Sequence, residues 1–275
     1  MKPFCGFLVT FFLLLLVATS FAQTGETTSF RFYSFRQGDP NIELQGNARI
    51  LFNGNAQLAD NDERNSGRVL YSRPVRLWDR TTGNVASFMT SFSFTMRDAY
   101  GYDPADGIVF FIAPENIQLT SEQGIGGALG LADPTGVGQF VGIEFDIFRN
   151  TEFGDPPYAH VGIDVNSVIS SKTVEWERVS GSVVEVTVIY DSSTKILSTA
   201  VTNENGDITT IAGEVDLRAA NLPEMVKFGF SSSTGDGRQV HLIRSWSFTS
   251  TLRYGAQSIT TTNNNGTNIE HVPEI

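Results

Sequence analysis

Between residues 144 and 160 the chain concentrates groups that could bind metal ions. The segment reads E-F-D-I-F-R-N-T-E-F-G-D-P-P-Y-A-H and contains the carboxylates of Glu144, Asp146 and Asp155, the carboxamide of Asn150 and the imidazole of His160. Calcium takes many oxygen ligands, whereas a transition metal accepts or prefers an imidazole. One short segment offers both ligand sets, which predicts a two-metal site.

A strand and a turn would bring these groups together. Side chains two residues apart in a strand face the same side, so Glu144 and Asp146 project together and Phe145 is left for the core. The Gly-Asp-Pro-Pro sequence at 154–157 predicts a turn that folds Asp155 back toward them. The alternative is a solvated acidic loop with a structural histidine, and the number of donors at this spacing argues against it.

The body of the chain has the two-residue period of β-strands. Phe92, Phe94 and Met96 alternate with serine and threonine, and the same pattern recurs at 228–231 and 245–249. Such alternation, rich in Phe, Val, Thr and Trp, is typical of half-buried strands, and no sustained helical stripe interrupts it. A dozen or so strands with one apolar face each require two packed sheets, so we expect a single all-β sandwich domain.

The first 22 residues have the features of a secretory signal peptide. Lys2 precedes an apolar run that ends near Val17, and small residues precede a cleavage site after Ala22. The run is shorter than the about 20 residues of a membrane span, so we expect no membrane insertion. The expected boundaries are 1–22 for the signal, 23–254 for the β-sandwich and 255–275 for a polar tail that is disordered or trimmed. The expected location is the secretory pathway, leading to the extracellular space or a vacuolar or storage compartment.

Composition limits the possible partners and the sources of stability. Cys5, the only cysteine, lies in the expected signal peptide. The mature domain therefore depends on a large core, bound metal or assembly instead of disulfides. The formal net charge of -11 argues against nucleic acid and anionic membranes as partners and is compatible with cation binding.

Several blocks along the chain resemble the legume lectins and occur in that family's order. They are G-N-V-A-S-F from Gly83, D-P-A-D-G-I-V-F-F-I-A-P from Asp103, F-V-G-I-E-F-D from Phe140, H-V-G-I-D-V-N-S from His160, V-T-V-I-Y-D-S-S-T-K from Val186 and H-L-I-R-S-W-S-F-T-S from His241. The resemblance covers nearly all of the mature region. It implies a secreted carbohydrate-binding protein with a jelly-roll sandwich of antiparallel sheets, and with calcium and manganese beside a shallow sugar pocket.

The resemblance implies two ligand sets within the segment described first. For manganese or another transition metal they are Glu144, Asp146, Asp155 and His160, with Ser170 through a water. For calcium they are Asp146, Asn150, Asp155 and the backbone carbonyl of Phe148. Family members commonly have tyrosine at position 148, and a main-chain ligand should survive the change to phenylalanine. Strand alternation and the family pattern favour a structural role for the neighbouring Asp164.

The same resemblance places a sugar pocket on adjacent loops. Its implied residues are Asp106, Gly127, Phe148, Asn150, Asp236 and Gly237. Asp106 follows a cis peptide bond in the family and would accept hydrogen bonds from two sugar hydroxyls. The Asn150 amide would bind calcium at one end and donate to the sugar at the other. Gly127, Asp236 and Gly237 would offer backbone N–H groups, and Phe148 would stack on the C–H face of the sugar.

Two features of the chain point to different sugars. The body looks most like a galactose-binding member of the family, whereas the loop S-S-T-G-D-G-R-Q from Ser232 has the length found in mannose/glucose binders. In the family this length tends to follow the C4 configuration that fits, so the loop favours mannose or glucose over galactose. The alternatives are a galactose-specific lectin and a storage or defence relative that has lost sugar binding.

An enzymatic function is not expected. Sandwich glycoside hydrolases use E-x-D-x-x-E on one strand, but Arg149 and Asn150 stand where the second glutamate would be needed. A millimolar single site contributes only about −4 kcal/mol, so useful binding to oligosaccharides or glycoproteins would need several sites together. By family analogy we expect a homodimer or homotetramer formed through the back sheet.

Overall fold

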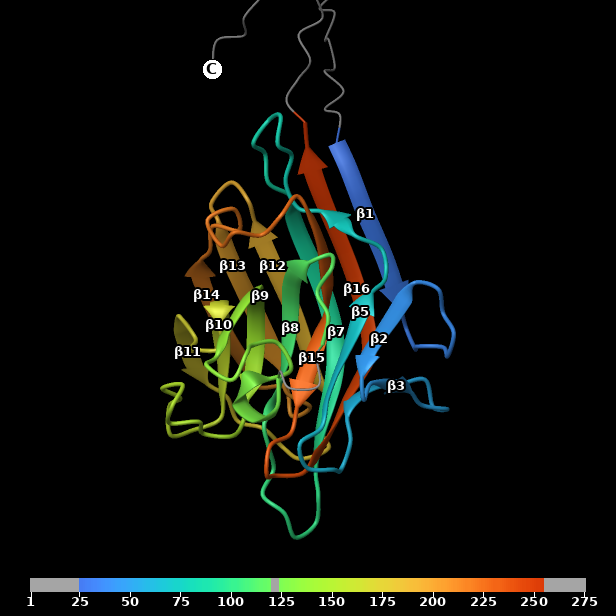
Figure 1. Ribbon diagram of the computed structural model, residues 1–275, viewed down its shortest axis with the longest axis vertical. Helices are drawn as coiled ribbons and strands as arrows, with labels where there is room; N and C mark the ends of the chain where they lie inside the picture. The colour runs from blue at the N-terminus through green and yellow to red at the C-terminus, as the bar shows by residue number, and fades with distance from the viewer. Residues whose placement is uncertain (1–24, 120–123, 255–275) are drawn as a thin grey trace, which may run out of the picture. The chain divides into compact units, whose positions relative to one another are not determined.

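Two antiparallel sheets form the part of the chain that the computed structural model describes, residues 25–119 and 124–254. The expected all-β sandwich is therefore confirmed (Figure 1). The expected signal peptide and C-terminal tail lie outside the described residues. Within the described ranges, no helix is long and apolar enough to cross a bilayer.

The first sheet, here called the back sheet, contains eight strands. Across the sheet they are β14 (Ile208–Glu214), β13 (Ile196–Thr202), β12 (Val184–Asp191), β7 (Ser87–Asp98), β16 (Gln239–Arg253), β4 (Ala56–Ala59) and β3 (Arg49–Ile50), with β1 (Gly25–Phe32) also paired to β16. The front sheet also has eight, in the order β11 (Lys172–Glu175), β10 (His160–Ser167), β9 (Val137–Asp146), β8 (Gly107–Pro114), β15 (Met225–Ser233), β5 (Ser66–Tyr71) and β2 (Ile42–Gly46), with β6 (Val75–Arg76) also paired to β15.

Aromatic side chains from both sheets fill the space between them. Phe92 and Phe94 of β7 are buried as their alternation predicts. The Phe92 ring meets Phe230 of β15 edge to face with centroids 4.8 Å apart, and Phe230 meets Trp246 of β16 at 4.9 Å. Offset and edge-to-face aromatic contacts add to the gain from apolar burial, so this layer fixes one sheet against the other.

Loops from both sheets meet at one end of the sandwich. The β7–β8 loop (99–106) and the β15–β16 loop (234–238) each cross between the sheets, and both lie at the lower end of Figure 1. Strand pairing places the strand ends that flank these loops together, because Asp98 is opposite Gln239 and Gly107 is opposite Ser233. The short 3-10 helix η1 (Gly126–Ala128) and the β9–β10 loop (147–159) reach the same end. The predicted sugar residues all lie on these segments.

Candidate functional site

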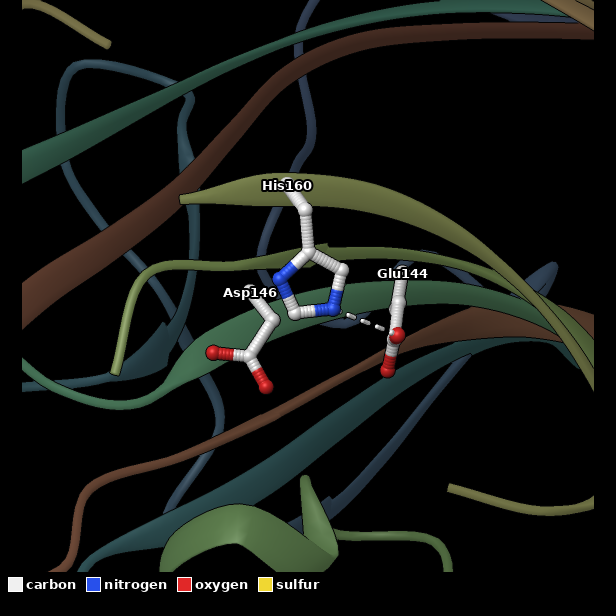
Figure 2. A group of neighbouring side chains, drawn as sticks. All are labelled: Glu144, Asp146 and His160. Atoms are coloured by element: carbon white, nitrogen blue, oxygen red, sulfur yellow. Dashed lines mark hydrogen bonds and ion pairs between the residues drawn. The ribbon is translucent and has the colours of Figure 1, made fainter. Parts of the chain in front are cut away.

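Strand pairing brings three of the predicted metal ligands together. His160 of β10 lies opposite Asp146 of β9, and Glu144 projects from the same face of β9. One ligand atom from each of the three side chains lies within 4.8 Å of the others, and all three residues are buried. His160 Nε2 is 3.1 Å from Glu144 Oε1, which is the dashed contact in Figure 2. Glu144 and Asp146 therefore project to one side of β9 as predicted, and the neighbouring strand β10 adds His160 to the group.

A glycine on β10 leaves the space that this group occupies. A Cβ at Gly162 would lie 2.0 Å from Ser170 Oγ and 2.3 Å from Glu144 Oε1. The Ser170 hydroxyl contacts Glu144 Oε1 at 2.6 Å and Asp164 Oδ1 at 2.7 Å. Ser170, expected to act through a water, thus touches Glu144 directly here. Asp164 is fully buried behind it, which fits the structural role expected for that residue.

Negative charge accumulates in this group. Burial raises the pKa of Asp146, and the charges of Glu144 and Asp155 raise it further. Burial likewise raises the pKa of Asp155 to about 6. Burial lowers the pKa of His160, but the hydrogen bond and charge of Glu144 outweigh this and raise it overall. Buried carboxylates crowded together favour either protons or a bound cation.

The donor set fits a metal ion. Glu144 Oε2 and Asn150 Oδ1 are buried and have no hydrogen-bond partner among the described residues. Asp155 lies in the β9–β10 loop, where its Oδ2 accepts the backbone N–H of Asn150 at 2.6 Å. Carboxylate and amide oxygens suit a hard cation, and the His160 imidazole suits a transition metal. This buried group could therefore hold a metal.

Asp106 lies at the centre of the loop cluster. The peptide bond Ala105-Asp106 is cis, as the family resemblance predicts. The Asp106 backbone N–H donates to Ser233 O at 3.1 Å, and its carbonyl accepts from Ile147 N at 3.0 Å. Its side chain is 1 % exposed, and Oδ2 has no partner in the described part of the chain. Burial raises the pKa of this carboxyl to about 7, with the charges of Asp236 and Asp155 adding to the effect.

The η1 segment lies close to both Asp106 and Asn150. A Cβ on Gly127 would lie 2.3 Å from Asn150 Oδ1 and 2.9 Å from Nδ2, so only glycine permits this approach. A Cβ on Gly126 would lie 3.9 Å from Asp106 Oδ1. The predicted residues Asp106, Gly127 and Asn150 therefore come together from three separate segments.

The remaining predicted sugar residues occupy different positions. Phe148 donates its N–H to Asp146 Oδ1 at 2.8 Å, and the residue is 39 % exposed. Asp236 is exposed at the loop tip. Gly237 is buried, and a Cβ there would lie 2.5 Å from Asp103 O, so it packs against the β7–β8 loop.

Gly235 is the residue of this loop that the sequence argument missed. A Cβ on Gly235 would be 3.3 Å from Asp106 Oδ2. The sequence T-G-D-G showed two glycines in this loop, but only the contacts of the folded chain separate the one that faces Asp106 from the one that packs beneath it.

Comparison with known proteins identifies the family of this chain. The model of the legume lectin domain matches residues 27–265. The chain belongs to the legume lectin family. A galactose-binding lectin of Arachis hypogaea is 63 % identical over 254 residues, covering 92 % of each chain. A solved structure of peanut lectin with a nine-residue peptide has a TM-score of 0.81 and 62 % identity, covering 84 % of this chain and 100 % of that one.

More distant legume lectins include proteins named for another sugar. A mannose/glucose-specific lectin of Centrolobium tomentosum is 42 % identical over 245 residues, covering 84 % of this chain and 99 % of the relative. Legume lectins are carbohydrate-binding proteins of the secretory pathway and not enzymes. Family membership therefore confirms the predicted resemblance, the sandwich fold and the non-enzymatic lectin function.

Proposed function

We propose that this legume lectin binds galactose and galactose-containing glycans. One observation carries the proposal. The Asp106 carboxylate, the Asn150 amide and the Gly127 backbone converge, and Asp106 Oδ2 and Asn150 Oδ1 are buried without partners in the described residues. Buried polar atoms are costly when unpaired, so a ligand that pairs with them gains affinity and orientation. A sugar hydroxyl can pair with Asp106 Oδ2, and a bound cation would pair with Asn150 Oδ1 and leave the amide nitrogen free to donate to the sugar.

Each residue has a separate task in this proposal. Asp106 accepts hydrogen bonds from two sugar hydroxyls, while the Gly127 N–H and one end of the Asn150 amide donate to the sugar. The partly exposed Phe148 ring receives the C–H face of the sugar. The backbone of the β15–β16 loop at Gly235 and Asp236 closes the side next to Asp106.

Two cations are part of the proposal. Manganese or another transition metal would be held by Glu144, Asp146, Asp155 and His160, with Ser170 beside them. Calcium would be held by Asp146, Asn150, Asp155 and the Phe148 carbonyl. Bound cations would supply the positive charge that balances these carboxylates. Secretion to the extracellular space or a vacuolar or storage compartment remains part of the same proposal.

The choice of galactose replaces the mannose/glucose preference predicted from loop length. That prediction depended on one short loop, whereas the relative that is 63 % identical over 92 % of the chain is named as galactose-binding. The mannose-specific relatives are less similar, at 42 % and 41 % identity. Similarity over nearly the whole chain is given more weight here than the length of one segment.

The sugar preference is tested by comparing epimers. We expect methyl β-galactoside to bind at least about tenfold more tightly than methyl β-glucoside, which differs only at C4. Asp106 is buried and held at both ends of its backbone, so it cannot move to follow a hydroxyl that points elsewhere. Isothermal titration with calcium and manganese present measures both affinities. Tighter binding of the glucoside or of methyl α-mannoside would overturn the galactose assignment.

We also propose that a second copy of the chain covers the outer face of the back sheet. A hollow of about 1350 Å³ lies there, with Ser29, Ser87, Ser91 and Thr249 among its lining residues. Met89 and Ile189 also line it and are 48 % and 42 % exposed. Apolar side chains on a largely small and polar sheet face suit close contact with another sheet.

The assembly is tested by sedimentation equilibrium. The protein is expected to have at least twice the mass of one chain at micromolar concentration. Met89→Glu should raise the dissociation constant of the assembly at least about tenfold, because it places a charge in the contact. Val137→Glu makes the same change at an exposed position of the front sheet and should have no effect. A monomeric wild type, or equal effects of both substitutions, would contradict the back-sheet assembly.

A further inference from the structure

A chain of hydrogen-bonded polar side chains crosses the core at the end that carries the sugar loops. Ser232 Oγ lies 2.6 Å from Nδ1 of His241, whose Nε2 lies 2.6 Å from Gln239 Oε1. Gln239 Nε2 donates to Asp98 Oδ1 at 2.5 Å. Arg178 donates to both carboxylate oxygens of Asp98, at 2.8 and 3.0 Å. This hydrogen-bonded network begins on β15 of the front sheet and passes through β16 to the end of β7 in the back sheet.

The contacts fix the direction of every hydrogen bond. Because the Gln239 amide nitrogen donates to Asp98, its oxygen faces His241 and must accept from Nε2–H. His241 Nδ1 then carries the lone pair that accepts the Ser232 hydroxyl. Burial lowers the pKa of His241 to about 3, so the ring stays neutral and keeps this single tautomer. The arrangement is a set of fixed orientations and does not switch near neutral pH.

An apolar side chain would suit the position of His241 in the core. Its partner across β7 is Met96, and the next inward residue of β16 is Ile243, both buried. Ser232, Gln239 and His241 are each 0 % exposed. Buried polar groups stabilise a fold less than apolar groups of similar volume unless every partner is present, but a fully satisfied network specifies orientation. The effect to expect from this network is therefore a fixed orientation of the segments attached to it.

Two sugar-site loops begin or end at residues of this hydrogen-bonded network or directly beside them. The β7–β8 loop, which carries Asp106, begins directly after Asp98. The β15–β16 loop, which carries Gly235, lies between Ser233 and Gln239. His241 thus connects the end of β15 to the start of β16 and, through Gln239, to the end of β7.

Further hydrogen bonds join the two loops to each other and to η1. The Asp106 N–H donates to Ser233 O at 3.1 Å, next to Ser232. The Arg238 N–H donates to Asp103 O at 3.0 Å, next to Gln239. Ser233 Oγ also donates to Gly126 O at 2.5 Å. A rotation of the Ser232–Ser233 segment would therefore move Asp106 and η1 together.

We propose that His241 is a positioning residue for sugar binding. Through Ser232 and Gln239 it holds the loops of Asp106 and Gly235 in fixed relation to each other. His241 does not touch the sugar, and the inference rests on the proposed function of the same site.

The test replaces His241 and measures binding well below the unfolding temperature. His241→Phe should weaken methyl β-galactoside binding at least about tenfold while bound calcium and manganese stay unchanged, since the metal residues lie outside this network. Chymotrypsin should also cleave faster after the exposed Tyr100 and Tyr102 of the β7–β8 loop. His241→Gln, whose amide can still donate to Gln239, should recover part of the affinity.

Two further variants separate positioning from general stability. Ser232→Ala removes only the loop-side hydrogen bond and should weaken binding several-fold; it carries the test if His241→Phe does not fold. Tyr190→Phe removes a buried hydrogen bond to Val215 O at the other end of the sheet. It should lower the unfolding temperature and leave sugar affinity unchanged.

The outcomes distinguish this inference from the proposed function. If the wild type binds galactoside and both His241→Phe and Ser232→Ala bind it equally well, His241 is only a core residue and the inference is overturned. If the wild type binds a different sugar, the same comparison is made with that sugar. If it binds none of the galactoside, glucoside and mannoside, the proposed function fails and the inference fails with it.

Discussion

Asp106→Asn is expected to weaken galactoside binding at least a hundredfold and to leave the sandwich folded. The carboxylate can accept from two sugar hydroxyls, whereas the amide keeps one acceptor and turns a donor toward the second hydroxyl. A hydrogen bond to a charged group is worth about 1.5–3 kcal/mol, and each 1.4 kcal/mol is about tenfold in affinity. Titration calorimetry measures the affinity, and circular dichroism melting measures the fold.

Stability should change little, because the charge of Asp106 does not stabilise the folded chain. Burial raises the pKa of this carboxyl to about 7, which means that folding favours its neutral form. The neutral amide has nearly the same shape and keeps the backbone contacts to Ser233 and Ile147. A large loss of unfolding temperature would mean that Asp106 acts mainly in the fold.

Asp236→Asn is the matched control for this experiment. It removes the same charge from a residue near enough to raise the pKa of Asp106, but the proposal gives its side chain no contact with the sugar. We expect at most about a twofold change in affinity. Equal losses from both substitutions would show that the net charge of the loops matters and that Asp106 has no special acceptor role.

The sequence predicted the elements whose patterns are local. Phe92, Phe94 and Met96 alternate with small polar residues, and the structure buries all three between the sheets. The same rule placed Glu144 and Asp146 on one side of a strand. Period-two alternation needs no knowledge of neighbours, so it can be recognised before the fold is known.

Contacts between distant segments could not be predicted from local patterns. Gly162 is required by Ser170 and Glu144, and Gly235 lies close against Asp106. Each glycine is indistinguishable in the sequence from one that only permits a turn. His241 stood within a recognised family block, yet its link toward Asp98 depends on the pairing of β16 with β7, and its contact with Ser232 depends on the packing of the two sheets.

The mannose/glucose preference predicted from loop length has less support than the galactose alternative, for a related reason. The length of the loop from Ser232 is visible in the sequence, but its effect depends on which atoms face Asp106. In the fold Gly235 lies against the Asp106 carboxylate, and Gly237 packs against Asp103 and Ala105. Loop length describes this arrangement only indirectly, so the overall similarity to a galactose-binding relative is the better guide.

Asp146→Asn is expected to have opposite effects on stability with and without metal. Asp146 belongs to both predicted ligand sets, so the variant should lose bound metal, galactoside binding and the rise in unfolding temperature that metal produces. Without metal the same change removes one buried charge from beside Glu144 and Asp155. The metal-free variant should therefore unfold at a higher temperature than the metal-free wild type at pH 7.5.

Calorimetric melting in EDTA and in calcium plus manganese measures both effects, and elemental analysis measures bound metal. Asn150→Asp is a useful contrast, because it adds a charge to the same group and should lower the stability of the metal-free protein. If Asp146→Asn destabilises the protein equally in both buffers, Asp146 is a fold residue and the crowding of charges is not the dominant effect.

The pH dependence of the metal-free wild type provides an independent check on that explanation. Asp155 and Asp106 have folded-state pKa values of about 6 and about 7, above the ordinary value of 3.8. A raised carboxyl pKa contributes stability that is complete below the unfolded value and is lost as the pH rises through the folded value. The raised pKa of His160 acts in the same direction, with its contribution lost above the ordinary value of 6.5.

The metal-free protein should therefore become less stable from about pH 4 to pH 7. The metal-bound protein should become more stable over the same range, because fewer protons compete for the ligands. Parallel curves would contradict the assignment of Asp146, Asp155 and His160 to one cation-binding group.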